Sequence, residues 1–131
     1  MFKVIIMLFC AFIINLFSAA SANTNISNAL HNMCTLVIAN DPIALREKIQ
    51  KVKKNYRLKL QHYYSGISCA GNSLIRTALL NNANETGKFL IHKLPRATLL
   101  SPEPDGRTLQ QWIDEKNLSD TPISLTLTNR I

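Results

Sequence analysis

Glycine, on which nucleotide-binding loops depend, is scarce in this sequence. Only four glycines occur among 131 residues, and they form no loop that would cradle a phosphate. The G-x-S-x-G motif of hydrolases and the H-E-x-x-H motif of zinc proteases are also missing. These absences favour a binding or structural protein over an enzyme, and we predict neither catalytic residues nor a cofactor.

Acidic residues are also few, and their positions indicate no catalytic pair. Acid–base catalysis needs two carboxylates near a cleft, whereas the candidates here fall in predicted turns or on polar helix faces. Those candidates are Glu85, Glu103, Asp105, Asp114 and Glu115. We expect Asp105 to organise its turn, and Glu85 to place a favourable negative charge at a helix N-terminus.

Cysteine occurs only three times, and no C-x-x-C spacing is present to make a redox-active pair. Four side chains offer groups that bind metals: His31, Cys34, His62 and Cys69. Their spacing matches no zinc finger, so we predict no metal site. We expect His31 to be a surface residue at a helix start.

Long hydrophobic runs are missing, but a shorter run opens the sequence. Residues 4–17 are almost all apolar, about 14 residues against the roughly 20 that a transmembrane helix needs. A lysine precedes this run, and the small residues Ala20 and Ala22 after it suit the pocket of a signal peptidase. We therefore predict a signal peptide over 1–22, removed to leave one exported domain, residues 23–131. An uncleaved membrane anchor is the alternative.

Two cysteines, Cys34 and Cys69, remain once Cys10 leaves with the signal peptide. Exported chains meet oxidising conditions, which favour a disulfide. The bridge would close a loop of about 35 residues and stabilise the fold by about 3–4 kcal/mol. Two free buried thiols are the alternative.

The spacing of apolar residues predicts a mostly α-helical domain. A stripe within 30–38 indicates a first helix, which the proline at 42 ends. Asp41 as N-cap and Pro42 at the first helical position begin a second helix, packed antiparallel on the first. Its predicted buried face is Leu45, Ile49 and Val52. Similar stripes predict further helices over 74–79, 86–94 and 109–113, with a proline-rich loop at 101–106.

Two segments allow more than one structure. Alternating apolar and charged residues indicate an extended segment at 56–64, whereas the spacing of Leu60 and Tyr64 suits a helix. Apolar residues also alternate near the end of the chain. There, residues 122–128 would add an edge strand, or residues 119–131 would form a loosely ordered tail.

Two predicted helix starts look alike, at residues 71–74 (GNSL) and 106–109 (GRTL), 35 residues apart. With residues 78–85 and 89–91, they resemble the turn and the two helices of an ankyrin repeat. The Thr-Pro-Leu-His tetrapeptide of that family is absent, and fewer than three copies are present. The resemblance implies antiparallel helical hairpins stacked in an ankyrin-like arrangement.

The cysteine pattern resembles that of a family of small exported bacterial proteins of unknown function. In that family a cysteine in the first helix precedes a second cysteine, followed by a glycine and a Ser-Leu-Leu-type helix. The matching residues here are Cys34 and residues 69–75 (CAGNSLI). The resemblance covers about residues 30–100, and it implies a periplasmic or secreted location without indicating an activity.

Positive charge is concentrated in one basic stretch, residues 46–59. The chain carries 15 Lys and Arg against 8 Asp and Glu, and Glu47 is the only acid in this stretch. Its cations are Arg46, Lys48, Lys51, Lys53, Lys54, Arg57 and Lys59. Such a stretch indicates binding to an acidic protein or to anionic lipid headgroups, and nucleic acid is not expected for an exported chain. The alternative is a solvated surface that keeps the protein soluble.

The sequence thus predicts an exported interaction module, periplasmic or secreted, whose basic face meets an anionic partner. The alternative function is a structural or accessory envelope protein without an anionic ligand. Membrane contact through the N-terminal segment is expected only if that segment stays uncleaved.

Overall fold

Short helices follow one another through residues 26–131, the part of the chain that the structure, a computed structural model, describes. The predicted signal peptide and its cleavage site near Ala22 lie outside these residues. The elements are α2 (Met33–Ile38), α3 (Pro42–Tyr56), α4 (Leu60–Tyr63), the 3-10 helix η2 (Tyr64–Gly66), α5 (Leu74–Leu80), α6 (Asn84–Lys93), α7 (Arg96–Leu100), α8 (Leu109–Glu115) and α9 (Pro122–Arg130). Because residues 26–131 hold no strand, only an isolated bridge, the mostly α-helical class is confirmed. None of their helices has the length and apolar character that crossing a membrane requires.

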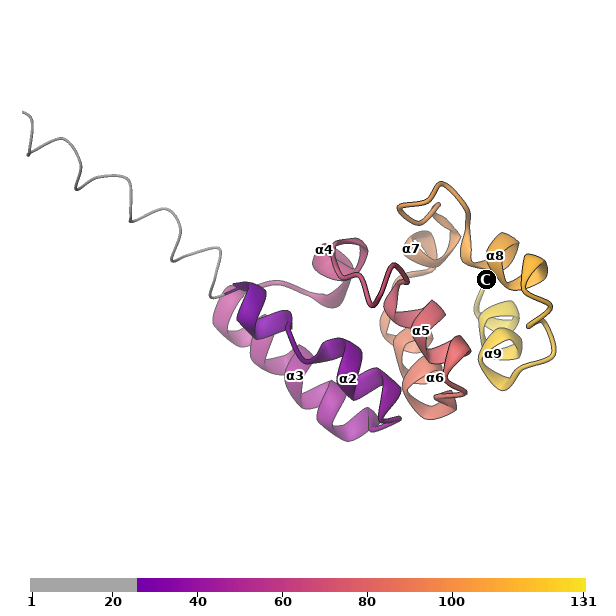
Figure 1. Cartoon of the computed structure of the whole chain (residues 1–131). Coiled ribbons are helices and arrows are strands. Elements are labelled where there is room, and N and C mark those ends of the chain that lie inside the picture. The colour runs from indigo at the N-terminus through magenta and orange to yellow at the C-terminus, as the bar shows by residue number, and fades with distance from the viewer. Residues whose placement is uncertain (1–25) are drawn as a thin grey trace, which may run out of the picture.

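The first two of these helices, α2 and α3, pack as an antiparallel hairpin (Figure 1). The turn between them is short because Asn40 adopts a left-handed φ of 55° and Asp41 caps the next helix at once. The Asp41 side chain accepts a hydrogen bond from the N–H of Ala44 at 3.0 Å. Pro42 occupies the first helical position, so this helix starts where the sequence predicted.

A second hairpin is formed by α5 and α6. Ser73 caps α5, since its Oγ accepts a hydrogen bond from the N–H of Arg76 at 3.3 Å. A left-handed residue, Asn82, then turns the chain into α6. The α6 helix contacts α3, α5 and α9, and therefore joins the two ends of the molecule (Figure 1). The short helix α7, which the apolar spacing did not predict, follows Pro95.

Of the two structures allowed for residues 56–64, the extended one is wrong and the helical one forms from Leu60 onward. Tyr56 ends α3, and the left-handed φ of 54° at Arg57 stops the helix. Three non-helical residues lead to α4, whose Leu60 and Tyr63 are buried. The apparent alternation therefore arises where a helix end, a short link and a new helix meet, and each contributes one or two apolar residues to the core.

The predicted edge strand at 122–128 and the loosely ordered tail at 119–131 are also wrong, because this segment forms α9. When apolar residues alternate, some of them are also four positions apart, which is the spacing of one helix face. In α9, Ile123 and Leu127 have this spacing and face the core, whereas Leu125 between them is exposed. The helix packs closely on α6 at Gly87, where a Cβ atom would overlap with the Ile123 side chain. Glycine is needed there for close packing.

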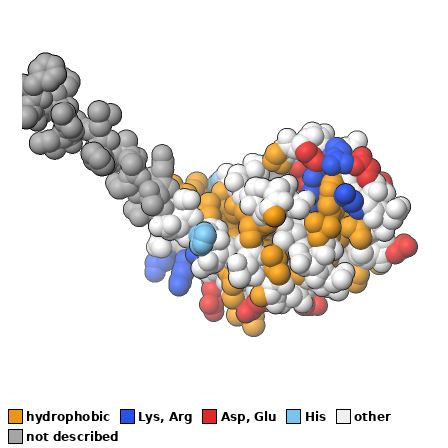
Figure 2. Space-filling model, in the orientation of Figure 1, with side chains coloured by type: hydrophobic (Ala, Val, Ile, Leu, Met, Phe, Trp, Pro, Cys, Tyr) orange, Lys and Arg blue, Asp and Glu red, His pale blue; other side chains and the backbone are white. Residues whose placement is uncertain are grey.

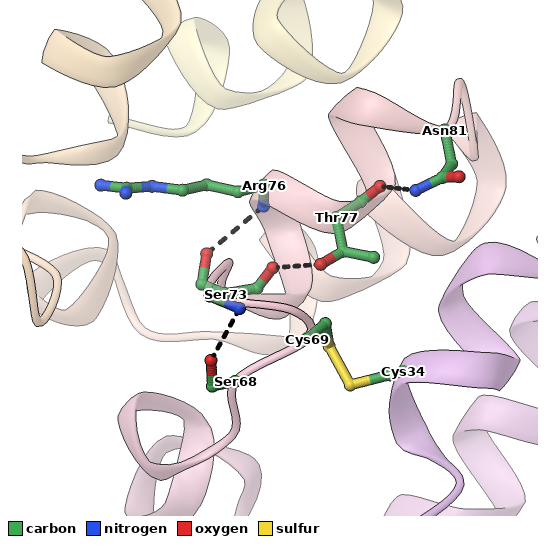
Figure 3. The surroundings of a disulfide bond; sticks show 8 residues. Cys34, Ser68, Cys69, Ser73, Arg76, Thr77 and Asn81 are labelled. Carbon is green, nitrogen blue, oxygen red and sulfur yellow. Dashed lines mark hydrogen bonds between the residues drawn. A yellow bond between two sulfur atoms is a disulfide. The ribbon is translucent and has the colours of Figure 1, made fainter.

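A disulfide joins the two hairpins. The sulfur atoms of Cys34 and Cys69 are 2.05 Å apart, and their Cα atoms are 5.6 Å apart. Cys34 lies in α2, and Cys69 lies just before the turn that leads into α5 (Figure 3). That turn contains two residues of positive φ, Ala70 and Gly71. The predicted bridge is therefore present, and it uses both cysteines that were considered as metal ligands.

Candidate anion-binding surface

A buried charge cluster lies where α5 meets the proline-rich loop. Arg76 is 5% exposed and Glu103 is 8% exposed, although the sequence placed Glu103 in an open turn. The Nε atom of Arg76 lies 2.5 Å from Oε1 of Glu103. The two Nη atoms of Arg76 donate to the carboxylate of Asp105 at 2.6 and 3.0 Å, in a bidentate pair.

Hydroxyl groups complete the surroundings of the Glu103 carboxylate. The Tyr64 hydroxyl donates to Oε2 at 2.7 Å, and the Ser73 hydroxyl donates to Oε1 at 3.0 Å. The Arg76 guanidinium also lies over the Trp112 ring, 5.1 Å from its centroid. Burial, followed by the Glu103 charge, holds the pKa of Tyr64 well above its usual range. Every charged group of the cluster is therefore compensated.

This buried cluster holds the fold together. A cavity of about 150 Å³ adjoins it, lined by Ser73, Arg76 and Glu103 among others. Both carboxylates are held by Arg76, and this pairing keeps the pKa of Asp105 below its usual range. Asp105 also accepts the N–H of Arg107 at 3.0 Å, which organises its turn. The cluster thus fixes the loop before α8 onto α5. An arginine within the apolar run of α5 was the sequence signal for it.

Removing the two neighbouring tyrosine hydroxyls should have different effects on stability. We expect Tyr64→Phe to lower the free energy of unfolding by about 1–3 kcal/mol, because Glu103 loses a donor in a buried site. Tyr63→Phe should leave it unchanged or raise it, since the Tyr63 hydroxyl is buried and has no hydrogen-bond partner within residues 26–131. Urea unfolding at neutral pH compares the two. Equal losses would contradict this assignment.

The same tyrosines predict a loss of stability at high pH. Burial raises the pKa of Tyr63 from 10.0 to about 12. The unfolded chain then loses this proton near pH 10 while the folded chain keeps it, so the stabilisation is complete below pH 10 and is lost as the pH rises to 12. Urea unfolding between pH 9 and 12 should show a weaker decline for Tyr63→Phe than for the native chain.

The basic stretch lies on α3 and on the link after it. The buried face of α3 is Leu45, Ile49 and Val52, as predicted, so the cations point to its other sides. Arg46 packs against α6, with its guanidinium carbon 5.3 Å from the centroid of the Phe89 ring. The structure therefore does not gather all seven cations into one site.

Two flanks of the same half of α3 each hold lysines. On one flank, Lys48 and Lys51 line a cavity of about 190 Å³ together with Ala29. On the other flank, Lys53 and Lys59 line a cavity of about 340 Å³. Lys54 and Arg57 are exposed and line neither of these cavities. Figure 2 shows Lys and Arg side chains at the end of the domain where the described chain begins.

The larger cavity is an open groove between α3, α4 and α6, which we call the lysine groove. Its lining residues are Ile49, Gln50, Lys53, Lys59, Leu60, Gln61 and Lys93. Lys93 comes from the last turn of α6, far from the basic stretch in sequence, and sequence reasoning missed it. Folding thus brings three lysines from three segments to one groove.

A family of proteins of unknown function, DUF3718, matches residues 33–101. The chain belongs to the DUF3718 family. The matched part of this DUF3718 protein contains both cysteines of the disulfide, the whole basic stretch and Lys93. No curated protein and no solved structure matches the chain.

Positive charge in the lysine groove is not neutralised within the described part of this DUF3718 protein. The four ion pairs found among residues 26–131 all involve Arg76 or Arg107, and none involves a lysine of the groove. Among residues 26–131, no Asp or Glu lines the groove. The groove therefore has the electrostatic character of a site for an anion.

Proposed function

We propose that this DUF3718 protein is a small exported interaction module whose basic face binds an anionic partner. The observation that carries the proposal is the lysine groove, where Lys53, Lys59 and Lys93 converge without a carboxylate to balance them. Like charges held together cost free energy unless an anion shares the site. A groove of this composition suits a partner that carries carboxylate or phosphate groups.

Two features support the exported location in the proposal. The Cys34–Cys69 disulfide is compatible with an oxidising compartment, where such bridges persist. The apolar run at 4–17, with small residues at Ala20 and Ala22, has the order of a signal peptide. In this proposal the chain works in the periplasm or outside the cell.

Other parts of the proposal follow from the same sequence patterns. In this proposal the hairpins α2–α3 and α5–α6 stack as helical pairs of the ankyrin-like kind. The proposal also takes the protein to be non-catalytic. The competing function is a structural or accessory envelope protein without an anionic ligand. This competing function predicts no ligand that depends on the lysines, because they would serve solubility alone.

Crosslinked capture from the host envelope tests the proposed function. The tagged full chain is compared with a variant that carries Lys48, Lys51, Lys53 and Lys54 changed to Glu. We expect the native chain to enrich a partner or lipid that the variant loses, and the enrichment to weaken steeply from low to physiological ionic strength. The same background in both samples would favour the structural alternative.

A matched control separates charge from local structure. Changing the same four lysines to Gln removes their charge without reversing it, and it should give an intermediate enrichment. Circular dichroism of both variants checks that α3 stays helical, since lysine, glutamate and glutamine have similar helix propensities.

A further inference from the structure

The lysine groove has the donors that a phosphate group requires. Lys53, Lys59 and Lys93 each offer an ammonium group, which binds phosphate as a point charge. Gln50 and Gln61 also line the groove, and their side-chain amides are neutral N–H donors. A phosphate presents several oxygen acceptors, so a groove lined by three lysines and two glutamines suits it.

The groove also accommodates the group that carries the phosphate. Its volume of about 340 Å³ exceeds that of one phosphate, and its lining includes apolar atoms of Ile49 and Leu60. Pockets for small ligands combine an apolar lining with a few placed polar groups, over a similar range of volumes. A phosphate diester with a short organic group therefore fits better than an inorganic ion.

The position of the groove points to a bilayer surface. Ala29, near the beginning of the described chain, shares a cavity with Lys48, Lys51 and Tyr56. The chain therefore enters the domain beside the C-terminal half of α3, the same half that contributes Lys53 to the groove (Figure 1).

The sequence that precedes this entry point contains an apolar run, residues 4–17. The eight residues from 18 to 25 reach at most about 30 Å when fully extended. In a chain whose N-terminal segment stays uncleaved, a bilayer that receives the apolar run therefore lies within reach of the lysines. Basic residues at such a surface each gain about 1 kcal/mol from anionic lipid, close to a fivefold change in binding.

We infer that the lysine groove binds the headgroup phosphate of an anionic phospholipid and orients the domain with the α3–α4 link toward the membrane. The inference rests on the proposed function and names its ligand; the orientation at the membrane applies to the chain that keeps its N-terminal segment. Lys48 and Lys51, on the other flank of α3, contact neighbouring headgroups without a groove of comparable volume.

Binding to vesicles tests the inference with the full-length chain. Two kinds of vesicle are used: phosphatidylcholine alone, and an equimolar mixture with phosphatidylglycerol. The apolar run contributes to both partition coefficients, so their ratio isolates recognition of the anionic headgroup. The groove variant carries Lys53, Lys59 and Lys93 changed to Gln.

The control variant, Lys116→Gln, removes an exposed lysine at the end of α8, outside the groove and away from the lysines placed at the membrane. We expect the ratio to fall roughly a hundredfold in the groove variant, from about fivefold for each lysine. It should stay within about twofold in the control variant, which is compared with the single groove substitutions. Each single groove substitution should lower the ratio by about fivefold, which keeps the test valid if the triple variant is poorly folded.

Several outcomes would overturn the inference. Equal losses in the groove and control variants would show a diffuse basic face, which leaves the proposed function standing and removes the groove. No preference of the native chain for anionic vesicles would also overturn it, while the envelope capture decides the proposed function separately. Lys53 and Lys93 lie in the last turns of their helices. A lower Tm in the groove variant with an unchanged ratio would assign them to the helix dipoles instead.

Titration with inorganic phosphate distinguishes the source of the ligand. If phosphate in solution binds the native chain and not the groove variant, while the vesicle ratio is the same for both, the groove serves a soluble phosphate. That result would overturn the lipid assignment. Loss of vesicle preference in the groove variant, with weak binding of inorganic phosphate, supports it.

Discussion

Replacing Arg76 with Met should lower the free energy of unfolding by about 3–5 kcal/mol. The guanidinium is 5% exposed, and it is the cation that holds the buried carboxylate of Glu103. Removing it leaves a negative charge in a site with two hydroxyl donors and no counter-charge, and such breaks in buried pairs are strongly destabilising. Urea unfolding monitored by circular dichroism measures the loss.

Two control variants test whether the charge cluster causes this loss. Arg107→Gln removes a partly exposed cation of the same loop, and it should cost less than about 1 kcal/mol. Arg76→Met combined with Glu103→Gln removes both charges while keeping an acceptor for Tyr64 and Ser73, and it should recover part of the lost stability. If Glu103→Gln lowers the free energy of unfolding as much in the Arg76→Met background as it does in the native chain, the two charges do not act as a pair and the prediction fails.

Replacing both cysteines with Ala should lower the free energy of unfolding by about 3–4 kcal/mol. Cys34 and Cys69 are separated by 35 residues, and their bridge removes much of the freedom of the unfolded chain between them. The native chain under a reducing agent should unfold with the same midpoint as this variant. Coincident thermal melts of the variant and the oxidised native chain would contradict the prediction.

The disulfide variant should stay folded at room temperature, because other contacts join the same two hairpins. The side chain of Asn40 accepts hydrogen bonds from the N–H groups of Glu85 and Thr86 at 2.8 and 3.1 Å. The Thr86 hydroxyl donates to the carbonyl of Val37 at 2.9 Å. These bonds tie the turn of the first hairpin to the start of α6, at the end of α2 opposite to Cys34.

This junction also affects the lysine groove. Lys53 belongs to the first hairpin and Lys93 belongs to the second, so the disulfide and the Asn40 contacts set the distance between them. If the groove binds a headgroup phosphate, loss of the bridge should weaken anionic vesicle binding more than it weakens binding to neutral vesicles. Redox state and ligand binding would then be coupled through the fold.

Local signals predicted the helices with strong caps. Asp41 and Pro42 start α3, and Thr108 starts α8 with a reciprocal bond to Gln111, because each cap involves residues within one turn. The last segment carries the same kind of signal, because Thr121 caps α9 and Pro122 is at its first helical position. The apolar alternation at 122–128 nevertheless suggested an edge strand or a loose tail, although two-residue alternation also contains the four-residue spacing of a helix.

The sequence did not indicate which buried polar groups contact one another. Tyr64 and Glu103 are 39 residues apart, and no periodic pattern relates them. Glu103 therefore looked like an exposed loop acid between two prolines. Lys93 likewise looked like one of the cations that often end a helix, and its place beside Lys53 depends on how α3 packs against α6.

The sequence by itself determined the helical class, the cysteine pair, the first hairpin and the concentration of positive charge in residues 46–59. These follow from spacing, capping and composition, which act over one or two helical turns. Only the tertiary structure decided which lysines share a groove, which acid is buried with Arg76, and that the last helix packs on α6 at Gly87. Those outcomes depend on contacts between segments far apart in the chain, and burial sets their energies only once the helices have packed.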